Sequence, residues 1–261
     1  MSTVESADGT PIAYDSTGTG TPVILVGGSF SRRHHPTMTQ LAEALSPHHT
    51  VYNYDRRGRG DSGDADTYTT QREVEDLAAL AEAAGGEVNV FGLSAGGALA
   101  LKAAAAGVSF SRVVVYDPPF VVDETGPRPP EGFRAELEEL AATDRRGDAV
   151  ELFMTRAMGA PAEAVAGMRA APFWGGLESL AHTLAYDTAL LGDFSLPTEE
   201  LGAVTTPVLV AHGDQTPPWL HAGARATAEA LANGELQTLK GQGIEIDPVA
   251  LAPELVAFYA K

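Results

Sequence analysis

One ten-residue stretch constrains the fold of this chain more than any other. An apolar run at 88–91 ends at Gly92, a serine follows at position 94, and a small-residue helix pattern covers 96–105. This order predicts a strand, a tight turn and a helix, with Gly92, Ser94 and Gly96 in a G-x-S-x-G turn. In that context the motif predicts a nucleophile elbow, which lifts the serine above the edge of a sheet. The alternative is an ordinary turn in which Ser94 only caps the helix.

Apolar runs and helical patterns alternate on both sides of this turn. Strands are predicted at 23–26, 51–54, 112–116, 207–212 and 236–239, after one or two antiparallel edge strands within 1–21. Helices are predicted at 36–45, 70–84, 219–232 and 248–259. This alternation predicts an α/β fold, with a mostly parallel sheet flanked by helices.

The segment 124–200 has a different pattern. It begins with a proline-rich break at 123–130 and contains no convincing strand. Helical patterns occur at about 131–143, 147–158, 161–169 and 175–190. We therefore expect a core domain made of 1–123 and 201–261, with residues 124–200 inserted as a helical lid over the sheet.

Charge and composition exclude several kinds of partner. The net charge is −18, which argues against nucleic acid and anionic membrane surfaces. The chain has no cysteine, so it forms no disulfide and has no thiolate chemistry. The first residues do not resemble a signal peptide, and no apolar run approaches the roughly 18 residues of a membrane span. We expect a soluble, cytoplasmic protein.

Four features resemble the α/β-hydrolase superfamily, in its helical-lid type. They are the Gly27-Gly28 loop, the turn Asp55-x-Arg57-Gly58-x-Gly60-x-Ser62, the elbow at Ser94, and the placement of 124–200 between the sixth and seventh strands. The resemblance implies acyl transfer, in which Ser94 attacks a carbonyl group. It also implies an oxyanion hole formed by the amide of Ala95 and that of Ser29 or Phe30. It makes the turn at 55–62 structural, with Asp55 and Arg57 paired.

The chain departs from the superfamily at the histidine of the triad. The loop after the last strand has Ile244 in the histidine's place, and no histidine occurs after His221. An isoleucine cannot accept a proton, so Ser94 lacks the base that would make it a good nucleophile. The acid is either Asp117, which ends a strand, or Asp214, which lies two residues before the expected position at Thr216. We favour Asp117, whose alternative role is that of a turn residue before two prolines.

Other histidines are candidates for the missing base. His182 lies in the predicted lid and could reach down to the site, so we take it as the recruited base. His212 ends the seventh strand and is expected to border the pocket, whereas His34 and His35 follow the oxyanion loop. Each of these residues has a structural alternative as a packed or surface side chain. The chain has no H-x-x-x-H spacing, so we expect no metal and no cofactor.

The pocket is expected to be apolar and covered by the lid. Its predicted lining is Gly28, Phe30, Leu93, Phe120, Trp174, His212 and Ile244. Phe173 and Trp219 are further aromatic residues near the lid or the strand ends, where they line the pocket or pack the lid on the core.

Three functional hypotheses remain. The first is an enzyme of secondary metabolism that acts on a small hydrophobic metabolite by chemistry without a triad, such as cyclisation, isomerisation or elimination. The second is a serine esterase, lactonase or related hydrolase that uses Ser94 with a recruited histidine. The third is a non-catalytic binding protein. A monomer or a homodimer is expected.

Overall fold

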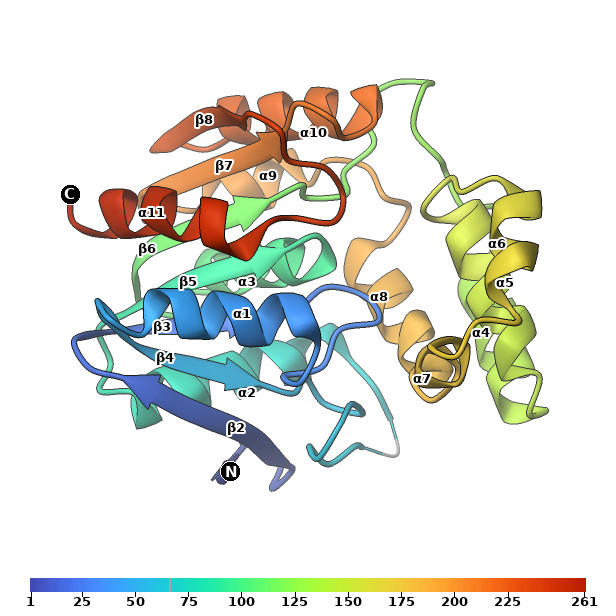
Figure 1. The fold of residues 1–261 in the computed structure, drawn as a ribbon, viewed down its shortest axis with the longest axis horizontal. Helices are drawn as coiled ribbons and strands as arrows, with labels where there is room; N and C mark the ends of the chain where they lie inside the picture. Colours follow the sequence, from blue (N-terminus) through green and yellow to red (C-terminus); the bar gives the residue numbers. More distant parts are fainter. Residues whose placement is uncertain (66) are drawn as a thin grey trace.

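The computed structural model describes residues 1–65 and 67–261, which form an eight-stranded sheet covered by helices (Figure 1). The strand order is β1-β2-β4-β3-β5-β6-β7-β8. β2 runs antiparallel to both its neighbours, whereas all pairs from β4 to β8 are parallel. The strands are β1 (Ser2–Glu5), β2 (Pro11–Gly18), β3 (Thr21–Val26), β4 (His49–Tyr54), β5 (Val88–Leu93), β6 (Phe110–Tyr116), β7 (Val208–Gly213) and β8 (Gly234–Leu239). The predicted mostly parallel α/β fold is confirmed.

Helices cover both faces of the sheet. On one face, apolar side chains of α1 (Pro36–Leu45) and α11 (Pro248–Tyr259) pack against β3, β6 and β7. On the other face lie α2 (Thr70–Ala83), α3 (Ala95–Ala105) and α10 (Pro218–Ala230). The central strands are buried on both sides, which explains why they are continuous apolar runs and do not alternate with polar residues.

Residues 124–200, all of which the structure describes, form helices and no strand. Figure 1 shows α4, α5, α6 and α7 beyond the carboxyl ends of the strands, at the right of the view. In place of the final predicted helix, 175–190, the structure has a short helix, a 3₁₀ turn and a second helix. The helices of this part are α4 (Phe133–Ala142), α5 (Arg146–Arg156), α6 (Ala162–Met168), α7 (Trp174–Glu178), the 3₁₀ turn Ala181–Thr183, α8 (Leu184–Leu191) and α9 (Thr198–Gly202).

The last helices of this segment pack against the helices that flank the sheet. α8 contacts both α4 and the core helices α2 and α3, whereas α9 packs on α3 and α10. The chain therefore returns to the core before residue 200. No helix formed by the described residues is both long enough and apolar enough to span a membrane.

Candidate functional site

Ser94 lies between β5 and α3, in the turn that the G-x-S-x-G motif predicts. Its φ of 51° and ψ of −119° are rare for residues other than glycine, a conformation that costs about 1–3 kcal/mol and is often found at functional sites. A Cβ added to Gly96 would lie 2.6 Å from the carbonyl oxygen of Gly27. Glycine is therefore needed for α3 to approach the end of β3 so closely.

Ser29 and Ala95 line the same cavity as Ser94. Ala95 is the first residue of α3, so its N–H has no partner within the helix. Across the described residues, no backbone hydrogen bond is found with either amide as donor. A Cβ on Gly28 would lie 3.3 Å from that of Ser94, which shows how closely this loop packs against the elbow. Neither amide is therefore committed to a backbone carbonyl of the residues that the structure describes.

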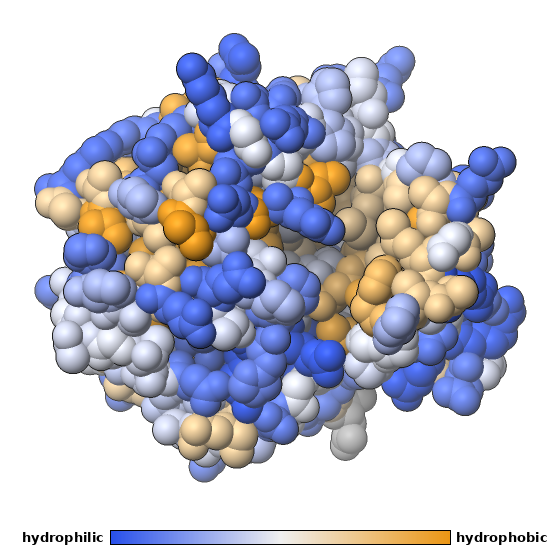
Figure 2. Space-filling view, in the orientation of Figure 1, coloured by the Kyte–Doolittle hydropathy of each residue, from blue (hydrophilic) through white to orange (hydrophobic). Residues whose placement is uncertain are grey.

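An apolar cavity of about 170 Å³ opens at this point. Its lining includes Ser29, Ser94, Ala95 and Asp117. Its remaining lining is Gly28, Leu93, Tyr116, Pro119, Phe153, Ala157, Met158, Leu191, Phe194, Trp219, Leu220 and Ile244. Figure 2 shows orange and tan side chains around a hollow between the sheet and the helices at the right of the view.

Asp117 is the carboxylate that lines the cavity. It follows β6 directly, with φ of 47°, and is only 4% exposed. Burial raises its pKa to about 8, although the Thr216 hydroxyl opposes the shift. Its Oδ2 has no hydrogen-bond partner among the described residues. Asp214 is exposed, and its Oδ1 accepts a hydrogen bond of 2.8 Å from the amide of Gly241.

Ile244 lies at the cavity on a loop that is fixed to the sheet. The Tyr116 hydroxyl donates to the carbonyl of Gly243 at 2.8 Å, and the amide of Gln215 donates to the carbonyl of Gln242 at 3.0 Å. The side chain of Ile244 is 56% exposed at the rim. An apolar residue therefore occupies the place in which we expected the superfamily's histidine.

The structure separates the recruited-histidine candidate from Ser94. His182 does not line the cavity, and its Nε2 is 2.9 Å from the carbonyl oxygen of Gly58. His212 also lies elsewhere: the hydroxyl of Thr238 is 2.9 Å from its Nε2, and its Nδ1 is 3.2 Å from the carbonyl oxygen of Gly213. His34 and His35 are exposed. The expectations that His182 and His212 face the pocket do not agree with this geometry.

Besides His212, three further predicted pocket residues lie outside the cavity lining. Phe30 packs edge-on against Phe153, with 5.7 Å between ring centroids. Trp174 is buried within the helical segment and donates from Nε1 to Glu178 at 3.0 Å. Phe120 lines a different pocket. Their aromatic character indicates burial, but it does not identify the cavity that a side chain borders.

Sequence reasoning missed most of the apolar lining. Phe153, Ala157 and Met158 come from α5 and the loop after it, and Leu191 and Phe194 come from the end of α8 and the loop that follows. The apolar face of α5 was the available signal, because a helix in the predicted lid must direct that face to the sheet.

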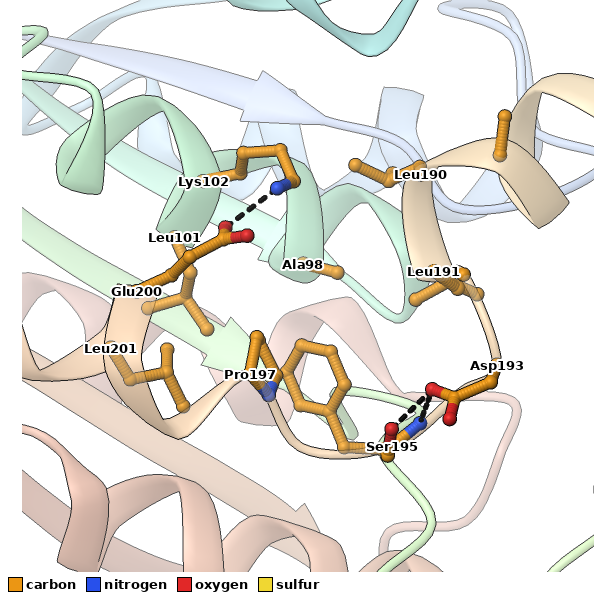
Figure 3. Close-up of a pocket in the computed structure, with 13 residues that line it drawn as sticks. Ala98, Leu101, Lys102, Leu190, Leu191, Asp193, Ser195, Pro197, Glu200 and Leu201 are labelled. Atoms are coloured by element: carbon orange, nitrogen blue, oxygen red, sulfur yellow. Dashed lines mark hydrogen bonds and ion pairs between the residues drawn. The ribbon is translucent and has the colours of Figure 1, made fainter.

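A second pocket of about 270 Å³ lies between α3, α8 and α9 (Figure 3). Leu191 borders both pockets. The figure marks the ion pair between Lys102 and Glu200, whose N–O distance is 2.6 Å. This pocket is larger than the Ser94 cavity, but it includes neither Ser94 nor Asp117. The chemistry of the protein is therefore discussed for the Ser94 cavity.

The turn at 55–62 holds several buried ion pairs. Arg57 pairs with Asp76 at 2.7 Å and with Asp8 at 3.0 Å, so the expected pairing of Asp55 with Arg57 is wrong. Asp55 instead pairs with Arg33, whose backbone amide also donates to Oδ1 of Asp55 at 2.7 Å. The structural role of the turn follows from these long-range contacts.

Arg56 and Arg59 point toward α8. Both pair with Asp187 of that helix at 2.8 Å, and Arg56 also binds Glu73 of α2 through two hydrogen bonds. Burial alone would raise the pKa of Asp187, but Arg59 and Arg56 outweigh it and hold the pKa below its usual value. The helical segment is thus joined to the core by buried charges.

Comparison with known proteins finds relatives that share the fold of this chain. The chain is 47% identical to an alpha/beta hydrolase from Sphaerobacter thermophilus, with a TM-score of 0.92 over 99% of this chain and 100% of that chain. It resembles an esterase from Rhodococcus sp. in fold, with a TM-score of 0.70, 22% identity and coverage of 100% and 98% of the two chains.

A shorter match links the chain to BpoC of Mycobacterium tuberculosis, whose name describes a candidate non-heme bromoperoxidase. The two are 38% identical over 73 residues, which is 27% of each chain. A family model described as the alpha/beta hydrolase family matches residues 23–253, nearly the whole chain. Together with the parallel sheet and the elbow at Ser94, this match shows that the chain belongs to the alpha/beta hydrolase family.

Proposed function

We propose that this protein is an enzyme that transfers a proton within a small apolar carbonyl compound without a serine–histidine–aspartate triad. One observation carries the proposal. Ser94, Asp117, Ser29 and Ala95 share one apolar cavity, and its described lining includes no histidine. A general base other than histidine must therefore act there, and Asp117 is the carboxylate in position.

The pKa of about 8 at Asp117 suits it to this role. Once ionised, such a carboxylate is a stronger base than an ordinary aspartate. In the proposed reaction it accepts a proton from the carbon beside the carbonyl, and the electron pair of the C–H bond forms an enolate. Asp117 then returns the proton to another carbon, which gives an isomerised product and restores the carboxylate.

The amides of Ser29 and Ala95 hold the enolate oxygen in this proposal. Preorganised amides in a cavity that excludes water stabilise developing charge strongly. The hydroxyl of Ser94, which lacks a base, stays protonated and serves as a further donor to the same oxygen. The substrate is small, because the cavity measures about 170 Å³ and most of its lining is apolar.

We further propose that the helical segment 124–200 acts as a lid. Phe153, Ala157 and Met158 of this segment line the cavity, with Met158 39% exposed at its rim. Movement of these residues would open the cavity to substrate, and their return would exclude water.

Proton exchange tests the proposal directly. Small apolar ketones and their β,γ-unsaturated relatives are incubated with the protein in D₂O, and deuterium incorporation is followed by NMR. We expect incorporation with the wild type and a loss of about 100-fold or more in Asp117→Asn. Asp214→Asn is the matched control, because that exposed residue stays outside the cavity and the new side chain keeps an acceptor for Gly241.

The alternatives give different results. Equal exchange in wild type and Asp117→Asn would contradict the proposal. Ester hydrolysis that is lost in Ser94→Ala but retained in Asp117→Asn would indicate a serine hydrolase. A ketone that binds in the cavity without exchange or turnover would indicate a binding protein.

A further inference from the structure

The Gly28–Ser29 peptide is held from behind by a buried guanidinium. Nη1 of Arg59 donates to the carbonyl of Gly28 at 2.7 Å. Arg59 is 1% exposed and does not line the Ser94 cavity, whereas Gly28 and Ser29 do. In a trans peptide the C=O and N–H groups point in opposite directions. Fixing the Gly28 carbonyl on Arg59 therefore directs the Ser29 amide away from Arg59.

Arg59 is itself fixed by the helical segment. Its Nη2 donates to both carboxylate oxygens of Asp187, at 2.8 and 2.9 Å. Asp187 belongs to α8 and is fully buried. Arg56 shares the same carboxylate and lies 3.5 Å from the carbonyl oxygen of Gly27. The loop at 27–29 is thus connected to α8 through the two arginines that bind Asp187, and also through the Ser29 hydroxyl, which helps to lower the pKa of Asp187.

We infer that Arg59 is a positioning residue, which orients the Ser29 amide toward the substrate oxygen. Because Arg59 is bound to Asp187, this orientation depends on the position of α8. The inference rests on the proposed function, because it assumes that this amide binds an oxyanion. Without such a bond, the Gly28–Ser29 peptide group could rotate and turn its carbonyl oxygen toward the bound anion. The carbonyl oxygen would then repel the anion. The Gly28 carbonyl accepts from Nη1 of Arg59 at 2.7 Å and from the Ser31 amide at 3.2 Å, and both bonds oppose that rotation. The bond from Arg59 is the shorter one and comes from a charged donor.

Anion binding tests the inference without a known substrate. Pentafluorophenolate is ionised near neutral pH and presents an oxyanion on an apolar ring, and pentafluoroanisole is its neutral counterpart. Binding of both is measured by fluorine NMR titration. We expect the wild type to prefer the phenolate, and we expect Arg59→Met/Asp187→Leu to lose about tenfold or more of that preference.

A second pair of substitutions controls for the loss of a buried ion pair. Arg57→Met/Asp76→Leu removes a similarly buried pair, which joins the same turn to α2, without touching the loop at 27–29. It should keep the wild-type preference. A preference that falls equally in both variants would overturn the inference.

A milder variant covers the case in which the first one does not fold. Arg59→Gln/Asp187→Asn removes the charges, keeps an acceptor at position 187, and shortens the side chain at 59 so that it no longer reaches Gly28. We expect the same loss of preference. An unchanged preference in a folded variant would show that Arg59 does not position the amide. A wild type that binds both probes equally would instead contradict the oxyanion hole of the proposed function.

Discussion

The hydroxyl of Thr216 lies 3.5 Å from Oδ1 of Asp117 but only 2.9 Å from the carbonyl oxygen of Gly213. A hydroxyl has one proton to donate, and the shorter contact is the better hydrogen bond. Asp117 is therefore buried with a weak partner, and burial dominates its pKa. With a pKa of about 8, the carboxyl group of Asp117 is mostly protonated at neutral pH.

The first prediction concerns stability against pH. The pKa of Asp117 rises from 3.8 to about 8 on folding, so the folded state retains a proton that the unfolded state loses. The free energy of unfolding should fall as pH rises through this window, by about 1.4 kcal/mol per pH unit. Asp117→Asn should lack this contribution, and asparagine tolerates a positive φ. Urea denaturation of both proteins at several pH values measures the difference.

Ser94→Ala is the control for that experiment. It changes the same cavity without changing a titratable group, so its pH dependence should match the wild type. Parallel curves for wild type and Asp117→Asn would mean that Asp117 is ionised in the folded protein at neutral pH.

The second prediction concerns the rate of proton exchange. Asp117 must be ionised to act as the base, so the rate of exchange should increase with pH and level off above about 8. The rate is measured across pH with one ketone held well below its KM. A rate that falls as pH rises through 8 would show that the protonated carboxyl is the active form.

The third prediction concerns Ile244. Its side chain lines the cavity, and histidine at this position would provide the missing base. A fluorophosphonate should label Ser94 slowly in the wild type and about 100-fold faster in Ile244→His. The labelled residue is identified by mass spectrometry, with Ser94→Ala as the control. Rapid labelling of the wild type would show that Ser94 is already activated.

The fourth prediction concerns Gly96. An alanine Cβ at this position would overlap the carbonyl oxygen of Val26 and lie 2.6 Å from that of Gly27. Both atoms belong to the backbone, so we expect Gly96→Ala to destabilise the protein by about 1–3 kcal/mol. Gly202→Ala is the matched control in α9, where a Cβ meets open space, and it should be neutral or slightly stabilising. The melting temperatures of the two variants and of the wild type measure this difference.

The sequence predicts much of this fold because local signals agree with tertiary structure. α1 was predicted within its observed bounds, since Pro36 begins it and Met38, Leu41 and Leu45 are its buried positions. The elbow was predicted from three residues, because few backbones allow a serine between two glycines at a strand–helix junction.

Contacts between distant residues were beyond sequence reasoning. Asp187 lies in an apolar helix, and neither spacing nor charge pattern indicates that Arg56 and Arg59 pair with it across more than 120 residues. The placement of His182 failed for a similar reason. Its helix was predicted, but the direction of its side chain depends on how α8 and the 3₁₀ turn pack against Gly58.

The buried ion pairs have a further consequence for the exterior. Four arginines (Arg33, Arg56, Arg57 and Arg59) lie inside with four acids (Asp55, Glu73, Asp76 and Asp187). Asp117 is a fifth buried acid, so removing four of the 17 basic residues and five of the 35 acidic ones leaves 13 cations against 30 acids in the rest of the chain. The excess acidic side chains outside the buried pairs therefore repel one another, whereas dissolved ions screen the buried pairs much less. Moderate sodium chloride should raise the melting temperature, although a count of ion pairs alone would suggest the reverse.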